Sequence, residues 1–336
     1  YMAQLHFLNV GEGDCSIIQH NDGIVTMIDI CCANLATNTI EKSFSTESFK
    51  GVKGNFNQKA SPTNPIDYLK TLGVTSIFRY IQTHPDMDHM DGLLQLKNNY
   101  TIVNFWDTRN SKEQSFDESG YNGIYKKEDG DCYQILRQSK SNPVALFYTD
   151  GDSKKYFAFN ENGKKTDDYL QILSPTPALL EAANKSGDWN DCSYVILYRI
   201  NGYKVLFCGD SKMKTINHLL LNHSNEISNL DVLIAPHHGR DGNMDFSFLG
   251  VMNPKVTLFG NAQSKDLAYN AWNKRKLFHI TNNQAGNIML DFLSSGIQIN
   301  VSNKTFADNF NMEKWQHLAK QSSMEGLWAL CRLNND

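Results

Sequence analysis

The chain has 336 residues, of which 40% are hydrophobic and 20% are charged, and its formal net charge is −4. This composition supports a large buried core, and the negative charge argues against a broad basic surface that coats duplex nucleic acid. No apolar run approaches the roughly 20 residues needed to cross a bilayer, so no membrane partner is expected. The seven cysteines are odd in number and irregularly spaced, several within apolar runs, which is typical of reduced thiols and favours a cytoplasmic protein.

Short strand patterns open the chain. The segments AQLHFLNV, CSIIQ and GIVTMIDI are joined by the turn sequences GEGD and HNDG, which predicts an antiparallel meander. Residues 33–65 are then rich in Asn, Thr, Ser, Lys and Gly, and they predict a polar surface excursion.

An alternation of helices and strands follows. PIDYLKTLG has helical spacing and a glycine stop, SIFRYIQT is a β-rich apolar run, MDGLLQLKNN indicates a short helix, and TIVNFW another strand. This β-loop-α-β order is typical of α/β folds. Residues 107–166 are polar and rich in turns, with one helical patch at CYQILRQSK, and we interpret them as an insertion.

The second half resumes this rhythm. Strand patterns occur at DYLQILSP, CSYVILYRI, KVLFCGD, DVLIAP, KVTLFG, KLFHIT, NIMLDF and GIQINVS, with a helix predicted at SKMKTINHLLLNH. Residues 309–333 have amphipathic spacing and predict a C-terminal helix, which either covers the sheets or mediates a homodimer. We therefore expect residues 1–336 to form one α/β domain, a four-layer αββα sandwich with insertions and a C-terminal helix.

A cluster of metal-binding side chains follows the strand at 76–83. The sequence THPDMDHMDGL places His84, Asp86, Asp88 and His89 in one irregular turn. Imidazole and carboxylate are the ligands of first-row divalent ions, and carboxylates this close without a cation would repel one another. The alternative for any one of these residues is an exposed polar loop or a helix cap.

Two more strand ends carry ligand chemistry. The strand KVLFCGD ends in Asp210, and DVLIAP is followed by His237 and His238 in a glycine-rich turn. Alone, each is more typical of an ordinary turn. Open α/β sheets keep their sites at the carboxyl ends of strands, so three such ends predict a shared metal centre.

These pieces together resemble the metallo-β-lactamase fold hydrolases, in particular the branch similar to the hydrolase domain of the DNA-uptake protein ComEC. The resemblance rests on FLNVGEGDCSIIQ, MIDI, THPDMDHMDGL, WNDCSYVILYRI, VLFCGD, LIAPHHG and the closing hairpin within KLFHITNNQAGNIMLDFLSSGIQI. It spans most of residues 4–301. It implies an αββα sandwich and two divalent metal ions, zinc or manganese.

The resemblance also implies residue roles. His84 and Asp86 would hold the first ion, Asp88 and His89 the second, and Asp210 would bridge them. We favour His238 as a ligand of the second ion, with His237 as a phosphate contact or proton donor, and the reverse assignment stays open. Asp88 and His237 are thus the residues expected to take part in catalysis.

Further positions are implied around the metals. Asp29 would orient the metal loop, as such sites need. Asp14 lies near the metals in such folds. Asn190, Ser193 and Arg240 are candidates for a substrate pocket, although each residue type is more often a cap or turn residue.

The sequence departs from the wider family in its ligands. Asp86 stands where most members carry histidine, and no histidine occurs between His89 and His218. The first site is therefore rich in oxygen, which makes manganese as plausible a metal as zinc.

The resemblance to the ComEC-like branch implies hydrolysis of a phosphodiester, such as nucleic acid or a nucleotide, and an oxygen-rich bimetal site that activates water suits a phosphate group. Two other functions stay open. One is hydrolysis of a lactone, thioester or β-lactam, and the other is a catalytically idle binding module with a degenerate metal site.

Overall fold

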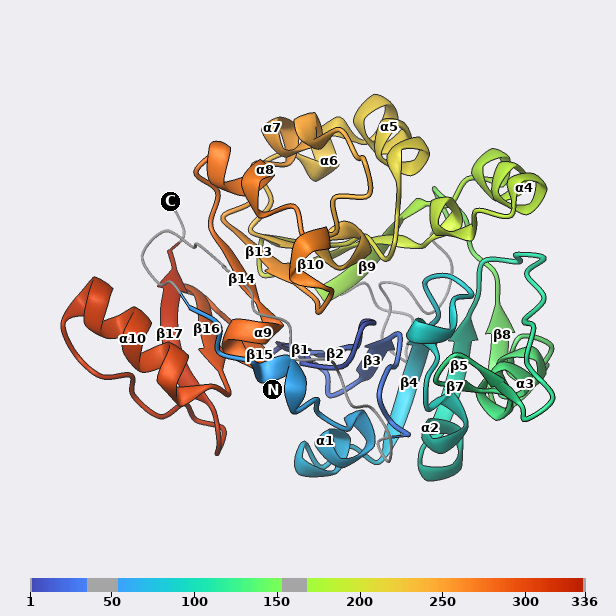
Figure 1. Ribbon diagram of the computed structural model, residues 1–336, viewed down its shortest axis with the longest axis horizontal. Coiled ribbons are helices and arrows are strands. Elements are labelled where there is room, and N and C mark those ends of the chain that lie inside the picture. The colour runs from blue at the N-terminus through green and yellow to red at the C-terminus, as the bar shows by residue number, and fades with distance from the viewer. Residues whose placement is uncertain (1, 35–53, 153–167, 335–336) are drawn as a thin grey trace.

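The computed structural model describes residues 2–34, 54–152 and 168–334, and within them two large β-sheets face each other with helices outside (Figure 1). A small hairpin of β6 (Tyr121–Asn122) and β7 (Tyr125–Lys126) forms a separate two-stranded sheet. In spatial order, the nine-stranded sheet contains β17 (Trp328–Leu333), β16 (Gly296–Val301), β15 (Ile288–Leu293), β1 (Gln4–Phe7), β2 (Ser16–Gln19), β3 (Val25–Ile28), β4 (Ser76–Ile81), β5 (Thr101–Trp106) and β8 (Val144–Leu146).

The six-stranded sheet is built by the second half of the chain. In spatial order, it contains β14 (His279–Thr281), β13 (Val256–Phe259), β12 (Val232–Ile234), β11 (Tyr203–Phe207), β10 (Val195–Ile200) and β9 (Asp168–Ser174).

Both sheets combine antiparallel and parallel pairs. The predicted meander is present, because β1, β2 and β3 pair antiparallel in sequence order. Beyond it, β3, β4 and β5 run parallel, as do β11, β12, β13 and β14 in the other sheet. The carboxyl ends of the parallel strands therefore lie along common edges, where loops can bring side chains together.

Three hydrophobic clusters define the layers. The first lies between the sheets and contains side chains of both, among them Phe7 of β1 and Phe292 of β15 in one sheet and Phe207 of β11 in the other. The second cluster joins the outer face of the nine-stranded sheet to the helices α1, α2 and α3, and the third joins the outer face of the six-stranded sheet to α5 through α8. The predicted four-layer αββα sandwich is therefore confirmed.

The helices cover the two outer faces and the edges (Figure 1). The α-helices are α1 (Pro65–Thr71), α2 (Leu93–Asn99), α3 (Lys127–Leu136), α4 (Pro177–Ser186), α5 (Met213–Asn222), α6 (Ser224–Ile227), α7 (Leu249–Met252), α8 (Tyr269–Lys274), α9 (Asn282–Ala285) and α10 (Lys304–Trp315). Local sequence explains several of their ends. For example, the side chain of Asn64 caps α1 by accepting from the backbone N–H of Ile66, and Pro65 occupies the first helical position.

The predicted insertion is part of the sandwich over residues 107–152, and its remainder, 153–166, lies outside the described residues. The helix α3 begins before the predicted patch at 132–140 and packs Cys132, Tyr133 and Leu136 against the outer face of the nine-stranded sheet. The strand β8 then extends that sheet by pairing parallel with β5. Of the polar excursion predicted at 33–65, residues 35–53 also lie outside the described residues.

The predicted C-terminal helix over 309–333 is wrong in its bounds. The helix α10 spans Lys304–Trp315, and Gln316 ends it in the left-handed conformation with φ 57°. Residues 328–333 instead form β17, which pairs antiparallel with β16 and buries Leu330, because an open sheet edge was available there. Phe306 and Phe310 of α10 pack into the core between the sheets. A homodimer through this helix stays a prediction.

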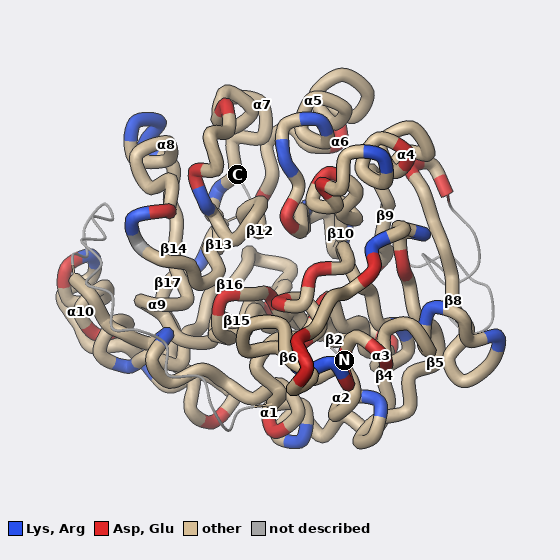
Figure 2. Tube along the Cα trace, turned by 45° about the vertical axis from the view of Figure 1, so that its right-hand side comes forward, with Lys and Arg blue, Asp and Glu red and all other residues tan. Residues whose placement is uncertain are grey.

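Charged residues are interspersed over the molecule. Figure 2 shows basic and acidic positions mixed along the described part of the chain trace. Among the described residues, no helix is both long and apolar enough to span a membrane.

Candidate metal centre

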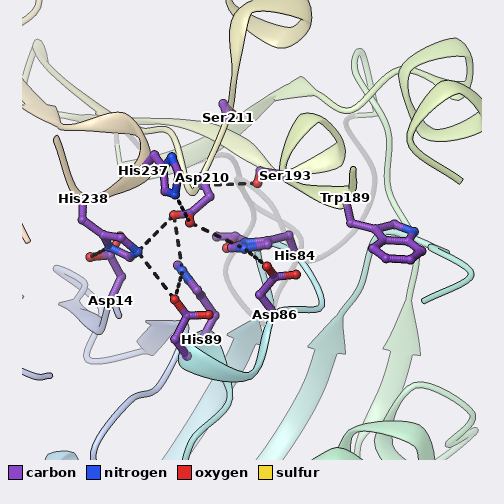
Figure 3. A network of polar contacts seen from close by, with 12 residues as sticks. Asp14, His84, Asp86, His89, Trp189, Ser193, Asp210, Ser211, His237 and His238 are labelled. Atoms are coloured by element: carbon purple, nitrogen blue, oxygen red, sulfur yellow. Dashed lines mark hydrogen bonds and ion pairs between the residues drawn. The ribbon is translucent and has the colours of Figure 1, made fainter. Parts of the chain in front are cut away.

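Side chains with metal-binding chemistry meet where strands of the two sheets end (Figure 3). The backbone N–H of Tyr194, just before β10, donates to the carbonyl of Thr83 after β4 over 2.9 Å, which joins the two sheets at this point. The predicted ligands are His84, Asp86, Asp88 and His89 after β4, Asp210 after β11, and His237 and His238 after β12.

Four of these residues form a tight group, which we call the second site. Asp88, His89, Asp210 and His238 offer ligand atoms that all lie within 4.8 Å of one another. Oδ1 of Asp210 is 3.3 Å from Nε2 of His89 and 3.4 Å from Nε2 of His238, and Oδ2 of Asp88 is 3.8 Å from Nε2 of His238. Atoms that each bind one ion at about 2.0–2.2 Å are about 3–4 Å apart. The group therefore has the dimensions of a single metal site.

The other oxygen of Asp210 faces a looser group, which we call the first site. Oδ2 of Asp210 is 3.8 Å from Nε2 of His84 and 3.5 Å from Nε2 of His237. Nε2 of His84 is also 3.9 Å from Oδ2 of Asp86. Asp210 thus presents one carboxylate oxygen to each group, which is the geometry of a bridging ligand.

Each imidazole of the metal loop is held by its other ring nitrogen. Nδ1 of His89 is 2.8 Å from Oδ2 of Asp29, and Nδ1 of His84 is 3.1 Å from Oγ1 of Thr83. The Thr83 hydroxyl donates its hydrogen to Asp29, so it accepts the Nδ1–H of His84. Both rings therefore direct Nε2 into the centre, as histidine ligands do.

The same arrangement holds His238, whose Nδ1 is 3.1 Å from Oδ1 of Asp14. The buried atoms without a hydrogen-bond partner in the described structure include Nε2 of His84, His89 and His238 and Oδ1 of Asp210. Leaving such atoms unsatisfied costs about 1–3 kcal/mol each. A divalent cation in the second site would satisfy Nε2 of His89 and His238 and Oδ1 of Asp210, and one in the first site would satisfy Nε2 of His84, so the residues present fit metal ions.

Asp88 and Asp210 are ionised at neutral pH. Burial raises the pKa of Asp88, but the neighbouring His89 and His238 outweigh burial, and the pKa lies at about 2. The pKa of Asp210 lies well below its usual value, because His238 and His89 outweigh the effect of burial in the same way.

The four imidazoles fall into two classes. Burial lowers the pKa of His89 and His238, but Asp210 and a second carboxylate raise both well above 6.5. Burial lowers the pKa of His237 to about 4, and burial together with His89 lowers the pKa of His84. The second site of the ion-free chain therefore holds protons that a cation would displace, whereas the first site offers neutral rings.

The turn after β12 has a strained backbone at the two histidines whose rings face the metal centre. His237 and His238 have φ of 51° and 56°, in the left-handed region that costs a non-glycine residue roughly 1–2 kcal/mol. The backbone N–H of His237 donates to the carbonyl of Gly209 over 2.9 Å, which fixes the turn beside Asp210. Strain of this kind is typical of functional sites.

The predicted substrate-pocket residues have different surroundings. Ser193 is buried, and its hydroxyl accepts from the backbone N–H of Asp210 over 3.2 Å, so its observed contact positions the bridging residue. Arg240 forms an ion pair with Glu12 at 3.1 Å. Asn190 lies half-buried in η3 (Trp189–Cys192).

Sequence reasoning missed two residues of the centre. Thr83 links His84 to Asp29, and its place directly before His84 at a strand end was the available signal. Lys112 lies in the insertion and pairs with Asp86 at 2.7 Å. Nothing in the local sequence around Lys112 indicates that contact.

A second group of ligand-type residues is explained by hydrogen bonding alone. Oδ2 of Asp150 is 3.0 Å from Nε2 of His218 and 2.9 Å from Nε2 of His223. The side-chain amide of Asn222 donates to the carbonyl of His218 and lies 3.0 Å from its Nδ1, so that nitrogen is an acceptor and Nε2 carries the hydrogen. In His89 the hydrogen-bonded hydrogen is on Nδ1 and Nε2 faces the centre, whereas in His218 the hydrogen is on Nε2. Nε2 of His218 therefore donates a hydrogen bond to Asp150 and is not free to bind a metal ion.

Comparisons with known proteins find similarity in structure. No protein-family model matches the chain, and no curated protein matches its sequence. A metallo hydrolase from the archaeon Ignicoccus hospitalis, Igni18, is similar over 86% of this chain and 100% of its own, with 12% identity and a TM-score of 0.48. A diphosphatase of the PhnP family is similar over 87% and 98%, with 12% identity and a TM-score of 0.44. The metallo-β-lactamase SMB-1 is similar over 69% and 79%, with 10% identity and a TM-score of 0.33. The solved structures similar to this chain thus include hydrolases of the metallo-β-lactamase superfamily.

Proposed function

We propose that this protein is a metal-dependent hydrolase that cleaves phosphodiesters, such as those of nucleic acid or a nucleotide. The observation that carries the proposal is the position of Asp210, whose two carboxylate oxygens face two separate groups of ligand atoms. One carboxylate shared between two such groups is the arrangement that places two cations on one substrate group.

Two bound divalent ions, manganese or zinc, would activate water and neutralise charge at a phosphoryl group. Asp88, His89 and His238 would hold the second ion, and His84 and Asp86 the first, with Asp210 common to both. His237 reaches the first site with a ring that is neutral at pH 7, so it serves there as a contact to phosphate or as a further ligand.

The ligand chemistry supports phosphate over a carbon-centred substrate. The first site contains Asp86 in place of an imidazole, and oxygen-rich sites suit the ions that accompany phosphates. The resemblance of the metal loop and the HHG turn to the ComEC-like hydrolases points to the same substrate class.

The test is a screen of the purified chain with manganese or zinc. Substrates are bis-p-nitrophenyl phosphate, single-stranded DNA, RNA, cyclic nucleotides and a lactone. Turnover of at least one phosphodiester is expected, with loss of at least about 10³-fold in Asp210→Ala and in Asp88→Ala/His89→Ala. His317→Ala, at an exposed position, is the control and keeps full activity.

Two outcomes contradict the proposal. Turnover of the lactone alone would assign a carbon-centred hydrolase. Fewer than one transition ion per chain after loading would assign a binding module without catalysis.

A further inference from the structure

The insertion brings a lysine to the rim of the metal centre. Nζ of Lys112 is 2.7 Å from Oδ1 of Asp86, and Oδ2 of the same carboxylate is 3.9 Å from Nε2 of His84. The Asp86 carboxylate therefore lies between the ammonium group and the first site. Lys112 belongs neither to a strand of the sheets nor to the metal loop, since it lies in the segment that follows β5.

Several contacts hold this lysine in place. The backbone N–H of Lys112 donates to Oδ1 of Asn110 over 3.1 Å, and that of Ser111 donates to Oδ1 of Asn184 over 2.8 Å. The side chain of Gln114 donates to the carbonyl of Pro85 in the metal loop. The segment is thus tied both to the metal loop and to α4.

The indole of Trp189 flanks the same position. Nζ of Lys112 is 5.3 Å from the centre of the Trp189 ring, and Figure 3 shows this ring on the side of the centre where Asp86 and His84 lie. Nε1 of Trp189 donates to Asn184, which is the residue that also holds Ser111. The lysine is therefore positioned from two directions.

The ion pair has little value for stability. The side chains of Lys112 and Asp86 are 20% and 31% exposed, and ion pairs this accessible contribute little to folding because solvent screens them. An ammonium group has three hydrogens to donate, and among the described residues Nζ of Lys112 has one hydrogen-bond acceptor, Asp86. The remaining donors are available to a bound anion.

The charged side chains around the centre favour a role for Lys112 in binding an anion. Asp86, Asp88 and Asp210 all face the two sites, and the nearby Arg240 is already paired with Glu12. Bound divalent ions would neutralise these carboxylates inside the centre. Lys112 places a further positive charge at the rim beside Asp86, where it attracts an anionic substrate that approaches from the solvent.

We propose that Lys112 binds a non-bridging oxygen of the substrate phosphate and so selects anionic substrates at this centre. The proposal rests on the proposed phosphodiesterase function, which it deepens by assigning a substrate contact to the insertion. Asp86 holds the ammonium group with one oxygen and faces the first site with the other. The substrate oxygen then takes a second hydrogen of the same ammonium group.

The experiment compares Lys112→Met and Lys112→Arg with the wild type. Calorimetry with Mn²⁺ alone gives metal affinity, calorimetry of the Mn²⁺-loaded protein with inorganic phosphate gives anion affinity, and bis-p-nitrophenyl phosphate gives kcat/KM. We expect Lys112→Met to bind Mn²⁺ as tightly as the wild type but phosphate about 10- to 100-fold more weakly, the range for a lost charge-assisted hydrogen bond. Its kcat/KM falls by a similar factor, and Lys112→Arg recovers part of the lost phosphate affinity, because its charge and hydrogen-bond donors remain.

Lys127→Met is the matched control, because Lys127 lies in the same insertion and pairs with Asp131 on an exposed surface. It keeps wild-type affinity for phosphate. Unchanged phosphate affinity in Lys112→Met overturns the inference, as does a parallel loss of Mn²⁺ affinity, which would mean that Lys112 only positions Asp86. Wild-type protein that binds phosphate through Lys112 without cleaving phosphodiesters would instead defeat the proposed function and leave the anion contact standing.

Discussion

His89 donates its Nδ1–H to Asp29 over 2.8 Å, and both side chains are buried. Asp29 also accepts from the backbone N–H and the hydroxyl of Thr83, so one carboxylate fixes the start and the end of the metal loop. The φ of Asp29 is 57°, a conformation that asparagine tolerates. Asp29→Asn therefore removes the charge with little change to the backbone.

We expect Asp29→Asn to weaken metal binding by about 10- to 100-fold, the usual effect of losing a carboxylate that orients a histidine ligand. Calorimetry with Mn²⁺ or Zn²⁺ measures the metal affinity of the variant and of the wild type. Asp67→Asn, which removes a carboxylate from an exposed pair with Lys70, is the control. Equal affinity in both variants would show that Asp29 does not support the ligand.

The two histidines of the HHG turn should differ in their effect on metal content. Nε2 of His238 lies in the tight second site, whereas Nε2 of His237 faces the looser first site. His238→Ala should lose about one bound ion per chain, and His237→Ala should keep the second site filled. Elemental analysis after dialysis against limiting metal gives the result, and the opposite pattern would exchange the two roles.

The ion-free protein should lose stability as the pH rises above about 7.5. The pKa values of His89 and His238 are raised in the folded chain, so both rings keep protons that the unfolded chain has lost. Their contribution to stability is complete below 6.5 and disappears as the pH rises through the raised values. Burial lowers the pKa of His6, His237 and His279 to about 4 and also lowers that of His84. These rings offset the decline around pH 6.5, where the unfolded chain still loses their protons, but above about 7.5 they are neutral in both states and no longer do so.

Melting temperatures in a chelator, measured from pH 7.5 to 9.5, check this expectation. Added Mn²⁺ should remove the decline, because the cation takes the place of the protons between the carboxylates and the imidazoles. A steady rise of the melting temperature in the chelator over the same range would contradict this account.

Gly239 should not tolerate a side chain. Its φ is 87°, and a Cβ there would lie 2.6 Å from Cδ2 of Phe259, in the core outside the six-stranded sheet. Gly239→Ala should lower the free energy of unfolding by at least about 2 kcal/mol, from the left-handed backbone and the overlap together. Gly250→Ala, where a Cβ meets nothing within 4 Å, should change it by less than about 0.5 kcal/mol. Urea denaturation of both variants measures the difference.

The sequence predicts most of the sheets because their strands carry local signals. The apolar runs of β4, β11 and β12 each lead into polar residues, so both the strand and its functional end can be located in the sequence. For the same reason, the residues of the metal loop could be found as a group. The roles within that group depend on side-chain direction, which spacing does not determine.

Other features depend on contacts between distant segments. The strand β17 forms because β16 offers an open edge, and the amphipathic spacing of its residues was interpreted as helical. The pairing of Lys112 with Asp86 joins residues 26 positions apart through the path of the insertion. Neither result follows from a local pattern.

The bridging residue Asp210 follows a strand of one sheet, and its partner His89 follows a strand of the other. A cation held between them would link the two sheets where these strands end, so its removal would weaken the contact between the two halves of the fold. Metal binding would therefore also stabilise the packing of one sheet on the other.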